Sequence, residues 1–341
     1  MTDSSSFGPF RTSLLRFLAS PAILNGAGSV YSWVNPEHPG FIYPEAMGLY
    51  LRLVSRIAAR DNDSPLRRRA DEVASGLDEL TPEIGGVGMA GKLYLFDTCM
   101  AVSGLVAYRR SLRAGAGAAT LEKMGRFIKD LTRRRVALVA EDGSPAALPH
   151  HWSTVFGTHM LKTVIALDSL AEETGDKEYR ELANGVADEV LEGCLRDGVF
   201  RISSKDTVVY THAHCYSLEG LLYLRAKGHR DTTPILVAGA DRLREWQNPD
   251  GSMFNWQMDD TRQRSKVGDA TAQTVRIWIA VDHARYAEQI RRGLVFLSTL
   301  QAPESGIYYC AGSRDVNSIS SVFATQAVDW HVNGAAPEWL V

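Results

Sequence analysis

Residues 212–228 read His-Ala-His-Cys-Tyr-Ser-Leu-Glu-Gly-Leu-Leu-Tyr-Leu-Arg-Ala-Lys-Gly. The leucines of this stretch recur at helical spacing, and Gly228 ends the pattern. Two histidines, His212 and His214, occupy the start of a segment that is otherwise apolar nearly all round. Such a segment is typical of a helix that is buried on two sides, with polar groups only in its first turn.

The same arrangement, a loop rich in glycine, aromatic and polar residues followed by an apolar helix, occurs six times along the chain. One polar residue marks each helix start, and successive markers are separated by 52, 62, 55, 55 and 52 residues. A repeat of this length holds one helix pair and two connections, which indicates a repeat architecture. The markers are Glu45, Asp97, His159, His214, Asp269 and Ser321.

More polar amphipathic segments lie between these helices, each with a single apolar stripe, as expected of exterior helices. They cover 65–80, 117–138, 176–195, 231–247 and 284–301. Five complete pairs are followed by an unpaired apolar segment at 319–331, and a helix expected at 7–19 can pair with it and close a ring. The sequence therefore predicts an all-α fold, an (α/α)6 toroid of six helical hairpins with short β-ribbons in the loops. A linear solenoid would need polar capping repeats at both ends, and neither terminus has that character.

Composition and charge limit the classes of partner and location. The 341 residues have a net charge of −3, 45% hydrophobic and 23% charged residues, with no linker that divides the chain, so we expect a single domain over residues 1–341 and no nucleic-acid partner. The four cysteines show no paired spacing, which fits a reducing compartment. Residues 1–20 make a poor signal peptide and no apolar run is long enough to span a bilayer, so we expect a cytoplasmic protein without membrane insertion.

Two stretches, Gln-Asn-Pro-Asp-Gly-Ser-Met-Phe at 247–254 and Gly-Asp-Ala-Thr-Ala-Gln at 268–273, resemble α/α-toroid proteins of the six-hairpin glycosidase and terpenoid-cyclase type. Phe-Asp-Thr at 96–98 and residues 212–216 strengthen the likeness, which covers most of the chain and is similar to bacterial members found with polysaccharide or natural-product biosynthesis genes. The resemblance implies an enzyme with a central cavity, but these motifs do not specify a reaction.

One departure concerns the acidic motif of class II terpene cyclases, Asp-x-Asp-Asp. The nearest match here is Gln-Met-Asp-Asp-Thr at 257–261, in which Gln257 replaces the first acid. Protonation of a terpene olefin is therefore not expected.

Three acids at helix starts are the candidate catalytic groups. Asp97 and Asp269 each have an ordinary alternative role as a helix N-cap, and Glu45 as a partner of the helix dipole. Gathered around one cavity, such carboxyls can divide general-acid and general-base duties, and their separation would decide retaining or inverting glycoside chemistry. His214 is the expected assisting group.

The candidate substrate-binding residues are further polar and aromatic side chains near the predicted mouth. Each has a structural alternative: a hydrogen-bonded core histidine, an aromatic packing anchor, a buried ion pair or a salt bridge between loops. They are Trp152, His159, Tyr210, His212, Trp256, Arg276 and Arg314. The spacing of His212, His214 and Cys215 is not a zinc-ligand pattern, so neither a metal site nor a cofactor is predicted.

We therefore expect a biosynthetic enzyme that applies acid–base chemistry to a glycoside-like or uronate-like polar substrate, either a small molecule or one bound to a carrier. An alternative is an intramolecular cyclase, for example one that forms an aziridine ring by displacing an anionic leaving group, mainly by positioning. A site dominated by arginine and histidine would favour the cyclase, and facing carboxylates flanked by tryptophan would favour sugar chemistry. A non-catalytic binding protein is the third alternative. A homodimer is left open, because the sequence does not give the oligomeric state.

Overall fold

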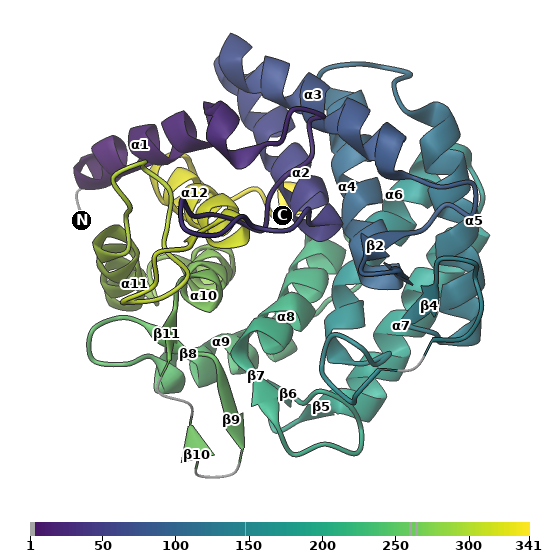
Figure 1. Ribbon diagram of the computed structural model, residues 1–341. Coiled ribbons are helices and arrows are strands. Elements are labelled where there is room, and N and C mark those ends of the chain that lie inside the picture. The colour runs from purple at the N-terminus through teal and green to yellow at the C-terminus, as the bar shows by residue number, and fades with distance from the viewer. Residues whose placement is uncertain (1–3, 147, 259–260, 263–264) are drawn as a thin grey trace.

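The computed structural model describes residues 4–146, 148–258, 261–262 and 265–341. Within these ranges the chain forms twelve α-helices arranged in two concentric layers (Figure 1). The inner layer consists of α2 (Pro44–Asp61), α4 (Leu95–Ser111), α6 (Val164–Thr174), α8 (Thr211–Ala226), α10 (Gly268–Asp282) and α12 (Ser318–Asn333). The outer layer consists of α1 (Gly8–Ala19), α3 (Ser64–Leu80), α5 (Ala118–Arg134), α7 (Glu178–Cys194), α9 (Thr233–Trp246) and α11 (Ala287–Thr299).

The inner helices form a closed ring. Each packs against the next one along the chain, and α12 packs against α2, while α1 pairs with α12 as the last hairpin partner. The approach of α2 to α4 depends on glycine: a Cβ added to Gly48 would lie 2.2 Å from the backbone of Met100. The predicted (α/α)6 toroid is confirmed, and the linear solenoid is excluded.

The two layers differ in burial as their sequences predict. All residues of α8 but its last two are buried, from Thr211 to Leu224. The outer helix α3 instead buries residues at helical spacing on one side, including Leu66, Ala70, Val73 and Leu77. The helix bounds agree with the predicted segments to within about four residues. The third inner element differs most, because residues 158–163 form a 3-10 helix, η3 (Thr158–Thr163), before α6 begins.

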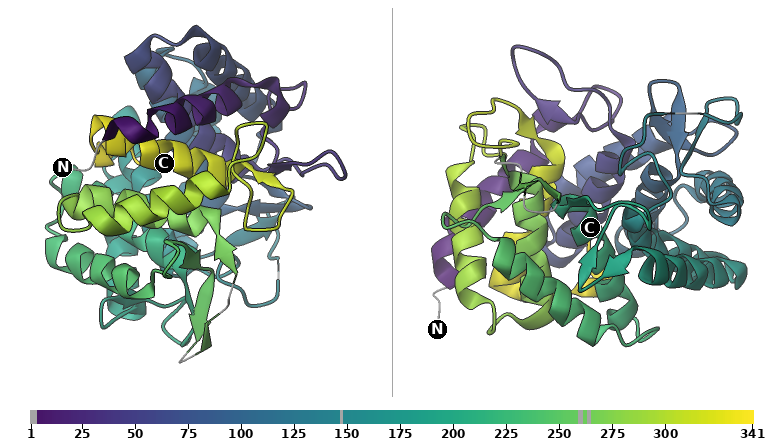
Figure 2. Two further views of the ribbon diagram at one scale, coloured as in Figure 1. Left: turned by 90° about the vertical axis from the view of Figure 1, so that its left-hand side faces the viewer. Right: turned by 90° about the horizontal axis from the view of Figure 1, so that it is seen from below.

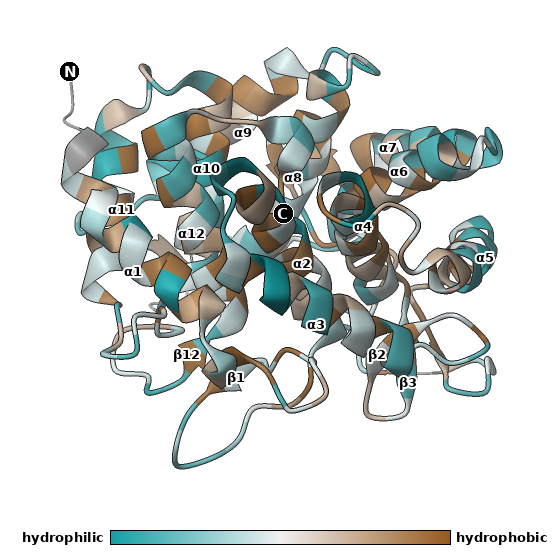
Figure 3. Ribbon diagram, turned by 90° about the horizontal axis from the view of Figure 1, so that it is seen from above, coloured by the Kyte–Doolittle hydropathy of each residue, from teal (hydrophilic) through white to brown (hydrophobic). Residues whose placement is uncertain are grey.

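Short strands gather at one end of the ring, next to the starts of the inner helices (Figure 2, Figure 3). They pair as β1 (Trp33–Val34) with β12 (Val316–Asn317), β2 (Val87–Met89) with β3 (Lys92–Tyr94) and β4 (Leu138–Ala140), β5 (Leu195–Arg196) with β6 (Val199–Phe200), β7 (Val209–Tyr210) with β9 (Trp256–Met258) and β10 (Thr261–Arg262), and β8 (Met253–Phe254) with β11 (Lys266–Val267). The predicted ribbons are therefore present in the loops. Asp259 and Asp260 of the cyclase-like stretch lie outside the described residues.

The opposite end of the ring is covered by residues 337–341, which lie near the ring axis in Figure 1. Arg52 Nε donates to the carbonyl of Leu340 at 2.6 Å, and Arg276 Nη1 donates to that of Val341 at 2.7 Å. Both of these residues are buried. The ring therefore has one covered end and one end framed by ribbons. None of the described helices combines the length and the apolar character that crossing a membrane requires.

Candidate active site

The first turns of the inner elements bring the candidate polar residues to the ribbon end of the ring. The second position is occupied by Glu45 in α2, His159 in η3, His212 in α8 and Asp269 in α10. The third position of α4 is occupied by Asp97. Equivalent positions of a closed ring face one another, so residues far apart in the sequence converge. In α8 the residue equivalent to the other markers is His212, two positions before the predicted His214.

A cavity of about 270 Å³ opens among these helix starts. Its walls are mainly aromatic, with carboxyl, imidazole and hydroxyl groups between the rings. The lining residues are Phe41, Tyr43, Glu45, Met89, Tyr94, Phe96, Asp97, Trp152, Ser153 and His159. Their mixture of flat apolar surfaces and a few polar groups is what small-molecule sites commonly offer.

Trp152 organises the aromatic side of this cavity. Its ring centroid lies 5.4 Å from that of His159 and 5.4 Å from that of His212. Tyr216 continues the cluster, with its centroid 4.3 Å from His212 and 5.0 Å from Phe96. The predicted binding residues Trp152, His159 and His212 therefore lie together.

Glu45 is held by two phenols. Tyr216 donates to Oε1 at 2.5 Å, and Tyr43 donates to Oε2. Burial raises the pKa of Glu45, while these two hydrogen bonds act in the opposite direction by stabilising the carboxylate. The sequence contained a signal for both tyrosines, since Tyr43 precedes the helix start and Tyr216 stands one helical turn after His212.

Asp97 has the opposite environment. Its side chain is buried, and Oδ2 accepts no hydrogen bond from the described residues. Burial, with the charge of Glu45 as the second cause, raises the pKa of Asp97 well above its ordinary value. Asp97 is therefore the carboxyl most readily kept as the neutral acid, with a proton to donate into the cavity.

Asp269 lies beside the cavity and differs again in its electrostatics. Burial raises its pKa to about 6, and hydrogen bonding from the backbone of Ala270 (2.6 Å to Oδ1) counteracts part of that effect. Its charge is the main cause that raises the pKa of Tyr309, and it adds to the effect of burial in raising the pKa of Tyr43. Its Oδ2 lies 3.6 Å from Nδ1 of His212. A carboxyl with this pKa is ionised at neutral pH and can accept a proton.

The two histidines of the cluster are neutral imidazoles. Burial lowers the pKa of His159 to about 3 and that of His212 to about 3, the latter with help from the charges of Lys162 and Arg276. Neither ring nitrogen of His159 has a hydrogen-bond partner among the described residues. A neutral imidazole can donate through one nitrogen and accept through the other, which suits the hydroxyl groups of a ligand.

His214 lies away from the cavity and holds a ribbon instead. Its Nδ1 accepts the backbone N–H of Phe200 at 3.1 Å, and its ring packs 5.3 Å from that of Trp246. The fourth residues of three other inner helices accept a ribbon N–H in the same way: Thr98 at 3.0 Å, Thr271 at 3.0 Å and Ser321 at 2.9 Å. The repeat from which His214 was predicted therefore contains two kinds of polar position, one that faces the mouth and one that accepts a ribbon N–H.

Arg276 is fully buried beneath the mouth. Its guanidinium pairs with Glu219 and donates to Gln326 at 2.7 Å, and Glu219 also accepts from Lys162 Nζ at 2.8 Å. The buried neighbour of Arg276 is thus Glu219, and Arg276 does not line the cavity. Charged residues within an otherwise apolar helix, such as Glu219 and Lys162, were the sequence signal for this cluster.

The remaining binding candidates lie on the ribbons and loops. Tyr210 on β7 faces Trp256 on β9 in register, and the Tyr210 ring lies 6.3 Å from that of Trp152, so it supports the cavity wall. Arg314 forms an exposed ion pair with Glu37, which joins two loops. Among the residues that the structure describes, no group of three or more His, Cys, Asp or Glu side chains is arranged to hold a metal ion.

A closed ring of six helical hairpins, with acids and imidazoles at a mouth framed by ribbons, has the architecture of the six-hairpin glycosidase-type α/α toroids. Solved structures agree with this fold. The chain is similar to a cellobiose 2-epimerase from Bacillus thermoamylovorans B4167, with a TM-score of 0.78 and 11% identity over 95% of this chain and 99% of that one. It is also similar to a D-mannose isomerase, with a TM-score of 0.73 and 11% identity over 97% and 98% of the two chains.

An unsaturated glucuronyl hydrolase from Bacillus sp. GL1 matches with a TM-score of 0.72 and 12% identity over 96% and 97% of the two chains. No protein-family model and no curated protein matches the sequence. The TM-scores show a shared fold, and at 11–12% identity the likeness does not extend to the activity.

Proposed function

We propose that this protein is an enzyme that transfers protons on a neutral carbohydrate ring, in a reaction of the isomerase or epimerase class. The observation that carries the proposal is the division of the buried carboxyls around one aromatic-walled cavity. Asp97 is the group held as an acid, and Asp269, with a pKa of about 6, is the group able to act as a base. Pairs of acids with separated pKa values are a recurrent means of assigning acid and base roles.

Each of the other polar groups has a binding role in this proposal. His159 and His212 hydrogen-bond to substrate hydroxyls as neutral imidazoles, and Trp152 packs against the face of the ring. Glu45, held by Tyr43 and Tyr216, keeps negative charge in the cavity and so helps to keep Asp97 protonated. His214 and Arg276 are not given a catalytic or binding role, because their polar groups are engaged outside the cavity.

The charge of the cavity favours a neutral substrate. Its described lining includes two carboxyls and no lysine or arginine, so it offers no cation to pair with the carboxylate of a uronate or with an anionic leaving group. Carboxyls flanked by Trp152, without an arginine, favour sugar chemistry over the cyclase alternative. At about 270 Å³ the cavity is below the roughly 300–1,000 Å³ of pockets for drug-sized ligands, which suits a single ring.

Two matched substitutions test the assignment of the acids. Asp97→Asn and Asp269→Asn keep the shape of each side chain but cannot cycle a proton, so each is expected to lower turnover by roughly 10²–10⁴-fold. Asp241→Asn is the control, since Asp241 lies on the outer helix α9 and pairs with Arg285. Circular dichroism should show the helical signal of all three variants unchanged. Full activity of both Asp97→Asn and Asp269→Asn would refute the assignment.

Proton transfer at carbon and hydrolysis are distinguished by running the reaction in D2O. D-mannose, D-glucose and cellobiose are incubated with the enzyme and followed by proton NMR. An isomerase or epimerase should lose the signal of a C–H proton as deuterium enters from solvent, and the Asp269→Asn variant, which lacks the proposed base, should not. Release of a monosaccharide from cellobiose without deuterium at carbon would overturn the proposed reaction class and support a glycosidase.

The setting of the reaction is also a proposal. By its resemblance to bacterial proteins from biosynthetic gene clusters, we place the enzyme in polysaccharide or secondary-metabolite assembly, in the cytoplasm. A carrier-bound substrate and a homodimer remain open within that proposal.

A further inference from the structure

A second hollow, of about 250 Å³, lies outside the ring mouth between the β5–β6 hairpin, the β7–β9 ribbon and α9. We call it the arginine hollow, after Arg196, Arg201 and Arg242 in its lining. Asp197 is the one acidic residue in its described lining. The described lining therefore has three positive charges and one negative charge, whereas the described lining of the catalytic cavity has two carboxyls and no lysine or arginine.

These arginines have few acidic partners. Arg201 forms no ion pair or side-chain hydrogen bond with any described residue. Among the described residues, Arg196 donates only to the carbonyls of Glu192 and Leu195, at 2.9 and 2.7 Å. Carbonyl oxygens leave its charge uncompensated, so the positive potential of the hollow remains available to a ligand.

Of these three arginines, Arg242 alone pairs with a carboxylate in the described part of the chain, that of Glu245 at 2.8 Å. Both side chains of that pair are largely exposed, which makes it weak and easily exchanged for a stronger anion. Arg242 Nε also approaches the carbonyl of Asp197 at 3.3 Å. The third guanidinium thus remains able to bind a ligand.

The ribbon separates this hollow from the catalytic cavity. Val209 and Gln257 are paired across the ribbon, and both line the hollow. The side chains of the next pair, Tyr210 and Trp256, lie on the opposite face, because side chains alternate along a strand. Tyr210 packs on Trp152 at the cavity. The two sites therefore lie on opposite sides of one ribbon and have separate linings.

Two further groups in the hollow indicate the chemistry of a ligand. Oε1 of Gln257 is buried and accepts no hydrogen bond from the described residues, so it needs a donor such as a hydroxyl. The indole of Trp246 and the side chain of Val209 supply an apolar floor. We propose that the arginine hollow binds an oxyanion, either inorganic phosphate or a phosphate group carried by a sugar, as a site distinct from the catalytic cavity.

The test measures binding, so it does not depend on the proposed activity. Inorganic phosphate and glucose 6-phosphate are titrated calorimetrically into the wild type and into Arg201→Gln, at two salt concentrations. Loss of one charged contact should weaken binding roughly tenfold or more. Because the side chain of Arg201 has no polar partner among the described residues, the variant should unfold at the wild-type temperature or slightly above it.

Arg244→Gln is the matched control, since Arg244 is on α9 close to Arg242, pairs with Asp241 and does not line the hollow. It should bind both probes as the wild type does. Tighter binding of glucose 6-phosphate than of phosphate would support a sugar-borne group, and equal binding would support free phosphate. No binding to the wild type, or equal weakening by Arg201→Gln and Arg244→Gln, would overturn the proposal.

Discussion

The substitution Glu219→Gln should reveal how far the buried ionic cluster supports the fold. Glu219 has no exposed side-chain surface, and it is the carboxylate that pairs with both Lys162 and Arg276. Glutamine keeps the size of the side chain but removes its charge, which leaves two buried cations without a counter-ion. Breaking a buried ion pair in this way costs about 3–5 kcal/mol of unfolding free energy.

The expected change in melting temperature follows from the size of the protein. An unfolding entropy of about 2.1 cal/mol/K per residue converts this cost into a decrease of roughly 4–7 °C. The loss of unfolding free energy caused by Glu219→Gln should also become smaller as the pH rises toward the ordinary pKa of lysine. Burial lowers the pKa of Lys162 to about 8, and the charge of Glu219 opposes that shift. Without Glu219, the charged form of Lys162 destabilises the fold at pH values below its lowered pKa. Above that pKa the Lys162 side chain is uncharged, so the destabilisation decreases.

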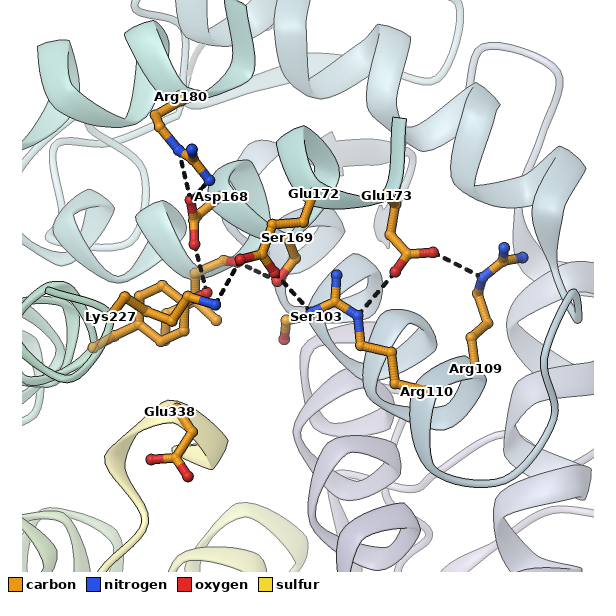
Figure 4. Close-up of polar contacts among 12 residues, drawn as sticks. Ser103, Arg109, Arg110, Asp168, Ser169, Glu172, Glu173, Arg180, Lys227 and Glu338 are labelled. Carbon is orange, nitrogen blue, oxygen red and sulfur yellow. Dashed lines mark hydrogen bonds and ion pairs between the residues drawn. The ribbon is translucent and has the colours of Figure 1, made fainter. Parts of the chain in front are cut away.

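A matched control comes from a partly exposed network at the covered end of the ring. Glu172 accepts from Arg110 at 2.9 Å and from Lys227 at 2.6 Å, and its side chain is 28% exposed (Figure 4). Water can solvate these partners when the carboxylate is lost, so Glu172→Gln should cost only about 0.2–1 kcal/mol. Thermal unfolding followed by circular dichroism compares the two variants. If Glu219→Gln destabilises no more than Glu172→Gln, the buried cluster does not have the assigned electrostatic role.

Three other predictions concern the pH dependence of activity, the site geometry and helix packing. Because the base Asp269 must lose its proton and has a pKa of about 6, kcat/KM should rise with pH through about 6; a profile flat from pH 5 to 7 would contradict its role. Tyr216→Phe removes one donor to Glu45, so the pKa of Glu45 should rise, measured by carbon-13 NMR of the carboxyl; an unchanged value would refute the contact. Gly48→Ala should destabilise the fold by several kcal/mol, because its Cβ meets the backbone of α4. The control Gly185→Ala on α7 should leave stability unchanged or raise it by up to about 1 kcal/mol. Equal melting temperatures of the two variants would contradict the close approach of α2 to α4.

The ring could be predicted from the sequence because its evidence is local and repeated. Apolar segments that end at Gly175 and Gly228 alternate with singly striped ones, and this alternation reports which helices have two buried sides. Closure required only that the helix at 7–19 pair with the helix at 319–331. The 3-10 helix η3 could not be predicted from the sequence pattern, because a 3-10 turn and an α-helix place apolar residues at nearly the same spacing.

The candidate site was predicted only in part, because helix starts contain more than one kind of polar position. The second residue of an inner helix points to the mouth, as at Asp269, and the fourth holds a ribbon, as at His214. Spacing alone could not separate them, since His212 and His214 give similar periods. The separation required knowing which backbone N–H groups of the ribbons need an acceptor.

The acid–base character of the mouth follows from closure of the ring. A single helix start in water would leave Asp97 solvated and ionised, with nothing to raise its pKa. Closure removes solvent and brings Glu45 of the neighbouring inner helix α2 close enough for its charge to oppose ionisation of Asp97. Asp269, with a backbone N–H within hydrogen-bonding distance, is shifted less. The difference between these carboxyls therefore depends on the local hydrogen bonds at each helix start, and on the proposed assignment it is this difference that makes one an acid and the other a base.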